Sequence, residues 1–471
     1  MTWAAPADLA GEHVIVVDLG YGDSGKGTVV DWLCSVSPRP PSVVRFNGGA
    51  QAAHNVVTPD GRHHTFAQFG AGMFTAGVRT HLSRFVLVDP LALAAEADHL
   101  AAVGVPEPLE RLTVDRDALL TTPYHRAANR ARERARGADR HGSCGMGIGE
   151  TAKYALDFPD DALRAGDCTA PGQLARKLRL VRDWFCEEFG EDTDEPTPAV
   201  EDVCLALSAF ADRVHLVGGG HLASLLRAGP VVFEGAQGVL LDEWHGFHPY
   251  TTWSTTTSAN AEALLGEAGQ TATRLGVLRC YLTRHGPGPL VTEDPTLELP
   301  DRYNRRNEWQ GPFRLGHFDT VALRYAVKVT GGVDSLALTH LDLAAHSRLL
   351  RCDRYLADGR FIDRLPVHFD RDLIRQQRLT GLLLRARPVY QSELPAIPPA
   401  DWPELVSEAL ASPVSVLSYG PTVRDKVTLT TSVDEDLRAS CHRRVNDRAE
   451  RGREVRRSRA ERAAGAGELL L

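Results

Sequence analysis

The chain has 471 residues, of which 43% are hydrophobic and 24% charged, a composition that suits a soluble globular protein and excludes disordered and collagen-like chains. Its formal net charge of −8 is small for this length and argues against nucleic-acid binding by the whole body. No apolar run reaches the roughly 18 residues that cross a bilayer, residues 1–12 lack a signal-peptide pattern, and the 8 cysteines never form Cys-x-x-Cys. We therefore expect a cytoplasmic protein with no membrane partner.

Short apolar runs alternate with segments of helical spacing along the chain. We expect strands at residues 13–19, 43–46, 85–88, 231–233, 276–281, 335–339 and 414–417. We expect helices at residues 28–34, 91–103, 123–136, 171–189 and 199–210. Because the late strands would complete the sheet that the early strands begin, this order predicts an α/β fold with a mostly parallel sheet, a helical insertion lobe and additional small lobes.

This order of elements also predicts the domain organisation. Residues 1–430 form a single α/β domain in this interpretation, with a mostly helical insertion at about residues 105–215. Residues 431–471 form an arginine-rich C-terminal tail. A solvated helix is the simpler interpretation of the tail, and a segment that binds a polyanion is the alternative.

Residues 20–26, Gly-Tyr-Gly-Asp-Ser-Gly-Lys, have the spacing of a phosphate-binding loop and lie between a predicted strand and a predicted helix. Glycines let consecutive backbone N–H groups face one concavity, and Lys26 adds a positive charge for phosphate oxygens. Gly27 stands where such loops have a hydroxyl for magnesium, so we predict that Asp23 is the metal ligand. The structural alternative is a glycine turn with a solvated lysine and aspartate.

Further polar segments lie where predicted strands end. His54 follows a glycine-rich strand end, where a loop can present it to a ligand, although a lone histidine is more often structural. Residues 233–238, Phe-Glu-Gly-Ala-Gln-Gly, follow another strand, and the hydroxyl-rich residues 242–257 come next. Residues 316–319 open a helix, and residues 339–342 and 418–421 each end a strand. Such dense uncharged hydroxyls and amides suit the base and ribose of a nucleotide.

In their order and amino-acid sequence, these segments resemble the adenylosuccinate synthetase family from about residue 13 to about residue 430. The phosphate loop, the loop ending in His54, the segment at residues 233–238, the Thr-Arg-x-Gly-x-Gly-Pro segment at residues 283–289 and two late segments recur in the order of the family. The resemblance implies a P-loop-type parallel sheet with added lobes. It also implies a homodimeric ligase that uses GTP and Mg²⁺ to join IMP to aspartate.

The resemblance implies a mechanism as well. Asp23 would take the N1 proton of IMP, so that the C6 oxygen attacks the γ-phosphate of GTP and an amine then displaces phosphate. His54 would donate a hydrogen bond to the transferring phosphoryl group, and Lys26 and Gln237 complete the implied catalytic set. Asp23 and the backbone carbonyl of Ala53 would hold magnesium. Such a reaction depends on positioning its reactants and neutralising phosphoryl oxygens.

Nucleotide-binding residues are also implied by the resemblance. Those for GTP are Gly22, Ser24, Gly25, Lys26, Gly27, Thr28, Arg314, His340, Asp342, Ser418, Gly420 and Pro421. Asp342 matches the aspartate that accepts from N1–H and the amino group of guanine, a donor pair that adenine lacks, so GTP is expected rather than ATP. Those for IMP, or a close purine nucleotide, are Gln51, Ser143, Cys144, Gln237 and Thr252. The arginine that the family sends across the dimer to the IMP phosphate has no clear match, and Arg164 is only a candidate.

The sequence departs from the family pattern at the loop that grips the aspartate co-substrate. Residues 307–314 read Asn-Glu-Trp-Gln-Gly-Pro-Phe-Arg, with Pro312 in place of an arginine and Gln310 in place of a threonine. A carboxylate without that arginine loses charge-assisted hydrogen bonds worth on the order of 3 kcal/mol, and Glu308 would repel it. Glu308, Trp309, Gln310 and Pro312 therefore predict an amine other than aspartate, such as an amino sugar, in nucleoside-antibiotic biosynthesis.

Two alternatives stay open. In a shifted register, Arg302, Arg305 or Arg306 would bind aspartate, and the chain would be an ordinary adenylosuccinate synthetase. The alternative of another class is a catalytically inactive protein that senses GTP or IMP and uses its tail to bind nucleic acid. Such a sensor would bind nucleotides without releasing phosphate in the presence of any amine.

Overall fold

The computed structural model describes residues 9, 11–190, 195, 197–301, 303–304, 308–344, 347–390 and 397–429. The predicted tail at residues 431–471 lies outside these described residues. In the described ranges, every helix is too short or too polar to span a bilayer.

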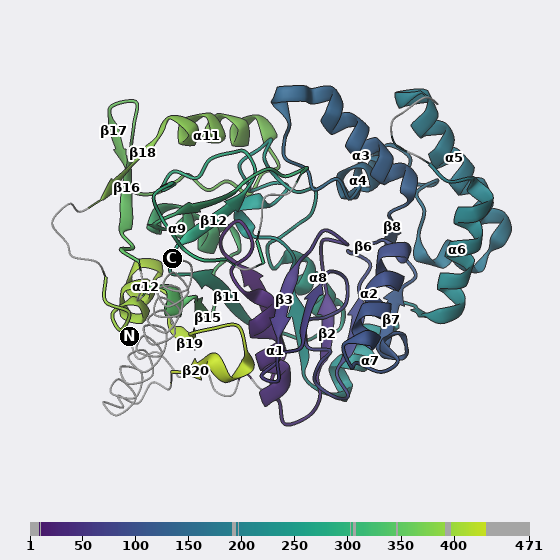
Figure 1. The fold of residues 1–471 in the computed structure, drawn as a ribbon, viewed down its shortest axis with the longest axis horizontal. Helices are drawn as coiled ribbons and strands as arrows, with labels where there is room; N and C mark the ends of the chain where they lie inside the picture. Colours follow the sequence, from purple (N-terminus) through teal and green to yellow (C-terminus); the bar gives the residue numbers. More distant parts are fainter. Residues whose placement is uncertain are drawn as a thin grey trace, which may run out of the picture.

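A mostly parallel sheet runs through the centre of the molecule (Figure 1), which confirms the predicted α/β fold class. Ten strands of the described residues form it, and all neighbours are parallel except β19 and β20. In sheet order the strands are β20 (Lys426–Thr428), β19 (Val414–Ser418), β15 (Ser335–Thr339), β11 (Thr273–Arg279), β1 (Val14–Asp18), β10 (Val231–Glu234), β2 (Ser42–Arg45), β5 (Arg79–Leu82), β7 (Leu112–Asp115) and β9 (His215–Val217).

Both faces of this sheet are buried. Alternate residues of β1 enter two hydrophobic clusters, with Val14 and Val16 in one and Ile15 and Val17 in the other. This follows from the two-residue period of a strand, and it explains why β1 reads as a continuous apolar run rather than an alternating one.

The helices cover the sheet and build an adjoining lobe. Their bounds are α1 (Lys26–Val36), α2 (Pro90–Ala102), α3 (Pro123–Arg136), α4 (Ile148–Asp157), α5 (Pro171–Phe189), α6 (Val200–Arg213), α7 (Gly220–Ala228), α8 (Ala259–Glu267), α9 (Thr320–Val329), α10 (Leu341–Ala344), α11 (Leu373–Arg385) and α12 (Trp402–Leu410). Helices α3 to α6 lie together at one side of the molecule (Figure 1). The bounds of α3 and α5 are those predicted, because each begins with a proline, which is well suited to the first turn of a helix.

The predicted strand at residues 85–88 was wrong as a member of the main sheet. Only β6 (Leu87–Val88) forms there, and it pairs with β8 (Leu119–Leu120) outside the main sheet. The main-sheet strand of this region is β5, whose sequence Arg-Thr-His-Leu has no apolar alternation that pattern analysis could detect. The predicted helical insertion at residues 105–215 also contains β7, which belongs to the main sheet. The domain boundaries stay a prediction.

Smaller sheets flank the main one. They comprise the hairpin of β3 (His54–Val57) and β4 (His63–Phe66), the pair of β12 (Leu282–His285) and β13 (Phe313–Gly316), and a four-stranded sheet of β14 (Phe318–Asp319), β16 (Arg351–Ala357), β17 (Arg360–Ile362) and β18 (Arg387–Tyr390). The segments that follow β1, β2, β10, β15 and β19 all leave the main sheet at the carboxyl ends of parallel strands. In open α/β sheets this edge is where ligands bind.

Candidate functional site

A cavity of about 790 Å³ is lined by the segments that leave the sheet at this edge. The predicted site residues on its wall are Gly22, Asp23, Gly25, Lys26, Gly27, Thr28, Gln51, Ala53, His54, Ser143, Cys144, Gln237, Thr252, Gln310, His340, Asp342, Ser418, Gly420 and Pro421. The cavity wall does not include the other predicted site residues, Ser24, Glu308, Trp309, Pro312 and Arg314. One cavity thus gathers residues from eight separate stretches of the sequence, between residues 22 and 421.

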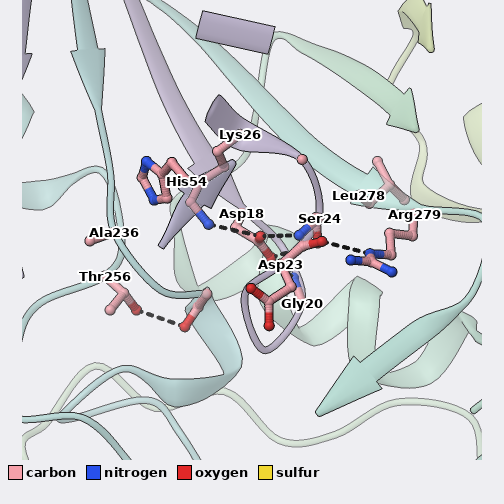
Figure 2. A network of polar contacts seen from close by, with 12 residues as sticks. Asp18, Gly20, Asp23, Ser24, Lys26, His54, Ala236, Thr256, Leu278 and Arg279 are labelled. Carbon is pink, nitrogen blue, oxygen red and sulfur yellow. Dashed lines mark hydrogen bonds and ion pairs between the residues drawn. The ribbon is translucent and has the colours of Figure 1, made fainter. Parts of the chain in front are cut away.

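The phosphate loop is held in shape by Asp18, the last residue of β1. Its carboxylate accepts from the backbone N–H groups of Gly20 and Ser24 at 2.8 and 3.0 Å, and from the Ser24 hydroxyl at 2.9 Å. The ammonium of Lys26 donates to the same carboxylate at 2.9 Å (Figure 2). Ser24 therefore stabilises the loop through Asp18 instead of lining the cavity. Asp18 was not among the residues predicted from the sequence.

Two glycines let three segments meet at the loop. A Cβ atom on Gly27 would lie 2.7 Å from the Cβ of His54, so a serine or threonine hydroxyl has no room at this position. A Cβ atom on Gly238 would lie 2.2 Å from the carbonyl oxygen of Gly20. The absence of the usual hydroxyl after Lys26 thus follows from the close approach of His54.

Asp23 lies at the tip of the loop in a left-handed conformation, with a φ of 59°. Such a conformation costs free energy for a non-glycine residue and persists where surrounding contacts hold it. The Arg279 guanidinium donates to its backbone carbonyl at 2.6 Å (Figure 2). The Nε2 atom of His285 lies 3.4 Å from its carboxylate. His285 occupies an unspecified position of the segment at residues 283–289, so sequence analysis passed over it.

His54 is oriented by a buried carboxylate. Its Nδ1 lies 2.6 Å from Oε1 of Glu234, and the other oxygen of Glu234 accepts from the N–H of Ala71. Burial lowers the pKa of His54, against the opposing effect of Glu234. Burial acts to raise the pKa of Glu234, but Arg45 and His54 together hold it below its usual value. A charged Glu234 thus fixes Nδ1–H of a neutral imidazole, which leaves Nε2 for the cavity.

Two amide side chains on the cavity wall have buried polar atoms without a hydrogen-bond partner among the described residues. Both polar side-chain atoms of Gln51 and the Oε1 atom of Gln237 make no hydrogen bond among the described residues. A buried amide without a partner costs about 1–3 kcal/mol, so these atoms fit a ligand that supplies donors and acceptors. The hydroxyl of Ser143 instead donates to Asn129 at 2.8 Å, and burial raises the pKa of Cys144 to about 11, which keeps this thiol neutral.

The predicted base-binding residues lie on the wall beyond β15 and β19. His340 has a φ of 59°, and its Nδ1 lies 2.8 Å from the hydroxyl of Thr339. Burial lowers the pKa of His340 well below its usual value, so the ring is uncharged and can stack on a base. Asp342 lies in the adjoining helix α10, and the hydroxyl of Ser418 donates to the carbonyl of Gly420 at 3.1 Å.

The predicted amine loop presents a different face from the one expected. Trp309 packs against helix α3 and the segment after it, with the guanidinium carbons of Arg130, Arg134 and Arg140 at 5.5, 5.3 and 5.9 Å from its ring. Gln310 is the member of the predicted set that reaches the cavity wall, whereas Glu308 and Pro312 are exposed. The loop therefore offers the cavity an uncharged amide.

The arginines that sequence analysis considered for ligand binding are engaged elsewhere or not described. Arg314 pairs with Glu293 and donates to the carbonyls of Gly286 and Gly288 at 2.9 Å. Arg164 donates to the carbonyl of Asp117 at 2.7 Å and is not among the residues of the cavity wall. Arg302, Arg305 and Arg306 lie outside the described residues.

The oxygen donors on the wall fit magnesium. Asp23 offers a carboxylate and Ala53 a backbone carbonyl on the same cavity, and both are hard oxygen ligands. Among the described residues, no three His, Cys, Asp or Glu side chains form a metal-binding cluster. Magnesium requires no such cluster, because it is commonly bound by one or two carboxylates together with substrate phosphates and water.

Comparison with known proteins gives consistent matches along the chain. A sequence model of the family described as adenylosuccinate synthetase matches residues 15–427. The adenylosuccinate synthetase of Ralstonia nicotianae is 31% identical over 458 residues, which cover 90% of this chain and 98% of that protein. The adenylosuccinate synthetase of Acidithiobacillus ferrooxidans is 32% identical over 449 residues, covering 90% and 99% of the two chains.

Solved structures share the fold. The fully ligated adenylosuccinate synthetase of Plasmodium falciparum has a TM-score of 0.74 at 21% identity, covering 89% of this chain and 100% of that chain. The succinoaminodeoxyadenylate synthetase of cyanophage S-2L, bound to dGMP and to dATP as an energy donor, has a TM-score of 0.56 at 19% identity, covering 89% and 95%. At these identities the likeness concerns the fold alone.

The pairing of His54 with Glu234 yields a pH prediction. Glu234→Gln removes the negative charge that favours the imidazolium form, so we expect the pKa of His54 to fall further below its usual value. Titration of the His54 ring signals by NMR measures this shift, and His54→Gln identifies those signals. A pKa of His54 that rises or stays unchanged in Glu234→Gln contradicts the assigned pairing.

Proposed function

Because the chain belongs to the adenylosuccinate synthetase family, we propose that it phosphorylates the C6 oxygen of IMP, or a close purine nucleotide, and then attaches an amine other than L-aspartate. The chain is a GTP-dependent ligase that forms a carbon–nitrogen bond, as its family is. The proposal concerns the amine and the residues that act on each substrate. A homodimer and a role in specialised nucleoside metabolism belong to the same proposal.

The observation that carries the proposal is the charge balance of the cavity wall. Every arginine and lysine among its described residues already holds a carboxylate or backbone carbonyls: Lys26 with Asp18, Arg132 with Glu150 and Glu188, Arg136 with Glu133, Lys153 with Asp157, Arg279 with Asp301, and Arg284 with the carbonyls of Pro287, Pro289 and Tyr250. Lys26 is assigned to phosphate below, so the two carboxylates of aspartate would compete with the carboxylates and carbonyls that the other wall cations hold. Moving a carboxylate from water into the cavity costs on the order of several kcal/mol of hydration free energy, and without a cation beside it this cost is not offset.

The residues of the amine loop support an amine that carries no carboxylate. The arginines of α3 hold Trp309 outside the cavity, so the Gln310 amide is the loop group that faces the substrates. An amide donates and accepts hydrogen bonds at once, which suits the hydroxyl groups of an amino sugar. Pro312, where the family has an arginine, adds no charge.

The reaction assigns one task to each group at the centre. Asp23 takes the N1 proton of the purine, which makes the C6 oxygen nucleophilic toward the γ-phosphate of GTP. Nε2 of His54, oriented through Nδ1 by Glu234, would donate to a phosphoryl oxygen in the imidazolium form, which the negative charge of Glu234 favours. Lys26 carries three hydrogens, so it can hold Asp18 and a phosphate oxygen together. Magnesium, held by Asp23 and Ala53, would neutralise phosphate charge.

An amine panel tests the function. The protein is incubated with IMP, GTP and Mg²⁺ and with L-aspartate, amino sugars or amino alcohols, and phosphate release and the mass of the purine product are followed. We expect phosphate and a new purine–amine product with an amine that carries no carboxylate, and much less with aspartate.

Two outcomes contradict the proposal in different ways. Aspartate as the best donor would make the chain an ordinary adenylosuccinate synthetase, an alternative that the names of the relatives favour. Nucleotide binding without phosphate release in the presence of any amine would indicate the sensor.

Asp23→Asn tests the proposed base. The amide cannot accept the N1 proton, so we expect turnover to fall about a hundredfold or more, in the range that general-base catalysis contributes. Asp160→Asn, which changes an exposed carboxylate away from the cavity wall, is the matched control and should leave turnover unchanged. Turnover of Asp23→Asn at the rate of the unmodified protein would refute the assigned role.

The double variant Gln310→Thr with Pro312→Arg tests the amine loop. It supplies the side chains that the family uses for the aspartate carboxylate, so we expect the KM for aspartate to fall about tenfold or more, as for a gained hydrogen bond to a charged group. The pair Gln310→Thr with Pro312→Gln lacks the charge and serves as the control. Equal KM values for aspartate in both variants would mean that this loop does not select the amine.

A further inference from the structure

Lys426 is a buried lysine behind the loop that closes one end of the cavity. It lies on β20, it is 8% exposed, and its ammonium donates to the backbone carbonyls of Gly420 at 2.9 Å and Thr422 at 3.2 Å. We call residues 418–422 the base loop. Ser418, Gly420 and Pro421 of this loop line the cavity, whereas Lys426 is not among the residues of the cavity wall.

The ammonium serves the loop rather than an acidic partner. Both of its hydrogen bonds within the described residues go to backbone carbonyls, although Asp31, Asp342 and Asp425 lie close enough to influence it electrostatically. Burial lowers the pKa of Lys426 to about 8, and the three carboxylates oppose that effect. A buried cation placed on two carbonyls fixes their direction, because turning either one away leaves the charge without a partner.

This arrangement determines which hydrogen-bonding groups the base loop can show to the cavity. The carbonyl of Gly420 accepts from both Lys426 and the Ser418 hydroxyl, so its two acceptor sites are filled. The carbonyl of Thr422 is held by Lys426 as well. The Gly420 amide, by contrast, makes no hydrogen bond with the described residues. The Gly420 carbonyl therefore has no acceptor site left for a base, whereas the Gly420 amide is available as a donor.

Purine bases differ at the group that such a loop would meet. Guanine carries an acceptor oxygen at C6, whereas adenine carries a donor amino group there. A backbone N–H donor pairs with the C6 oxygen of guanine, but it has no acceptor to meet at the amino group of adenine. Leaving such a buried polar group without a partner gives strong discrimination between two ligands. Choice of base is a real variable in this fold, because the cyanophage S-2L structure holds dATP as its energy donor.

We propose that Lys426 is a positioning residue that makes the site select a guanine over an adenine nucleoside triphosphate, by holding the carbonyls of Gly420 and Thr422 away from the base. The inference rests on the proposed function only in assigning this end of the cavity to the phosphate donor. Lys426 contacts no substrate and acts through the base loop.

Lys426→Met tests the inference, with Lys426→Arg as the conservative variant. Non-hydrolysable GTP and ATP analogues are titrated calorimetrically into each full-length protein, and kcat and KM are measured with GTP and ATP. We expect Lys426→Met to lose about tenfold or more of the preference for GTP, as for one or two misplaced hydrogen bonds, through Kd and KM rather than kcat. Lys426→Arg should recover part of that preference.

A second variant guards against simple misfolding. Burial raises the pKa of Asp31 to about 7 and Lys426 lowers it, so removing the lysine alone leaves a buried acid without its neighbour. Asp31→Asn with Lys426→Met removes both groups and should show the same loss of preference with a cooperative thermal transition. An unchanged ratio of GTP to ATP affinity in this folded double variant would overturn the inference.

The binding assay separates this inference from the proposed function. If no amine supports turnover but the GTP analogue binds in preference to the ATP analogue and only when Lys426 is present, the proposed reaction fails and the inference stands. If an amine supports turnover and the ratio of GTP to ATP affinity is the same with and without Lys426, the proposed reaction stands and the inference fails.

Discussion

The carboxylate of Asp18 receives two backbone amides, a hydroxyl and an ammonium at the point where β1 ends, and the remaining site depends on this cluster. Asp18 is 1% exposed, so its charge must be balanced by hydrogen bonds, and residues 20–26 provide them. The loop is thereby closed around one buried group. Its outer surface, with Asp23 and the backbone amides, is left for a ligand.

Close backbone approach then brings the reacting groups together. Gly27 admits His54 and Gly238 admits the phosphate loop, since a side chain at either position would overlap its neighbour. Asp23 and Gln237 both hold positive φ values where these segments meet. Strained conformations of this kind cluster at functional sites, because the surrounding contacts hold a geometry that the chain alone would not adopt. Here the two strained residues are Asp23, the proposed base, and Gln237, whose Oε1 atom has no hydrogen-bond partner among the described residues.

Buried charges are stable only beside a partner, and the two halves of the proposed reaction differ in the charged groups that are available to them. At the phosphoryl end, Lys26 and His54 each have a carboxylate that fixes their position, and the ammonium of Lys26 keeps further N–H donors for phosphate. The described cations of the cavity wall already hold carboxylates or carbonyls, and Trp309 packs on arginines and is not among the wall residues. In the proposed reaction, the activating chemistry of the family is retained while the amine subsite changes.

Local sequence determined the elements and the type of ligand. Apolar runs, proline-initiated helices and the glycine spacing of residues 20–26 are short-range signals, so the central strands, α3, α5 and the phosphate loop could be predicted. The order of motifs was also enough to identify the family. Strand β5 was missed because its four residues carry no such signal and form a strand only through pairing with β2 and β7.

Only the tertiary structure decided which side chains act together. His54 and Glu234 are 180 positions apart, and the carbonyl of Asp23 and the guanidinium of Arg279 are 256 apart. No local periodicity encodes such pairs, because they form when parallel strands bring their carboxyl ends to one edge. The orientation of Trp309 was hidden for the same reason: its arginine partners lie on and just after α3, more than 150 residues earlier in the chain.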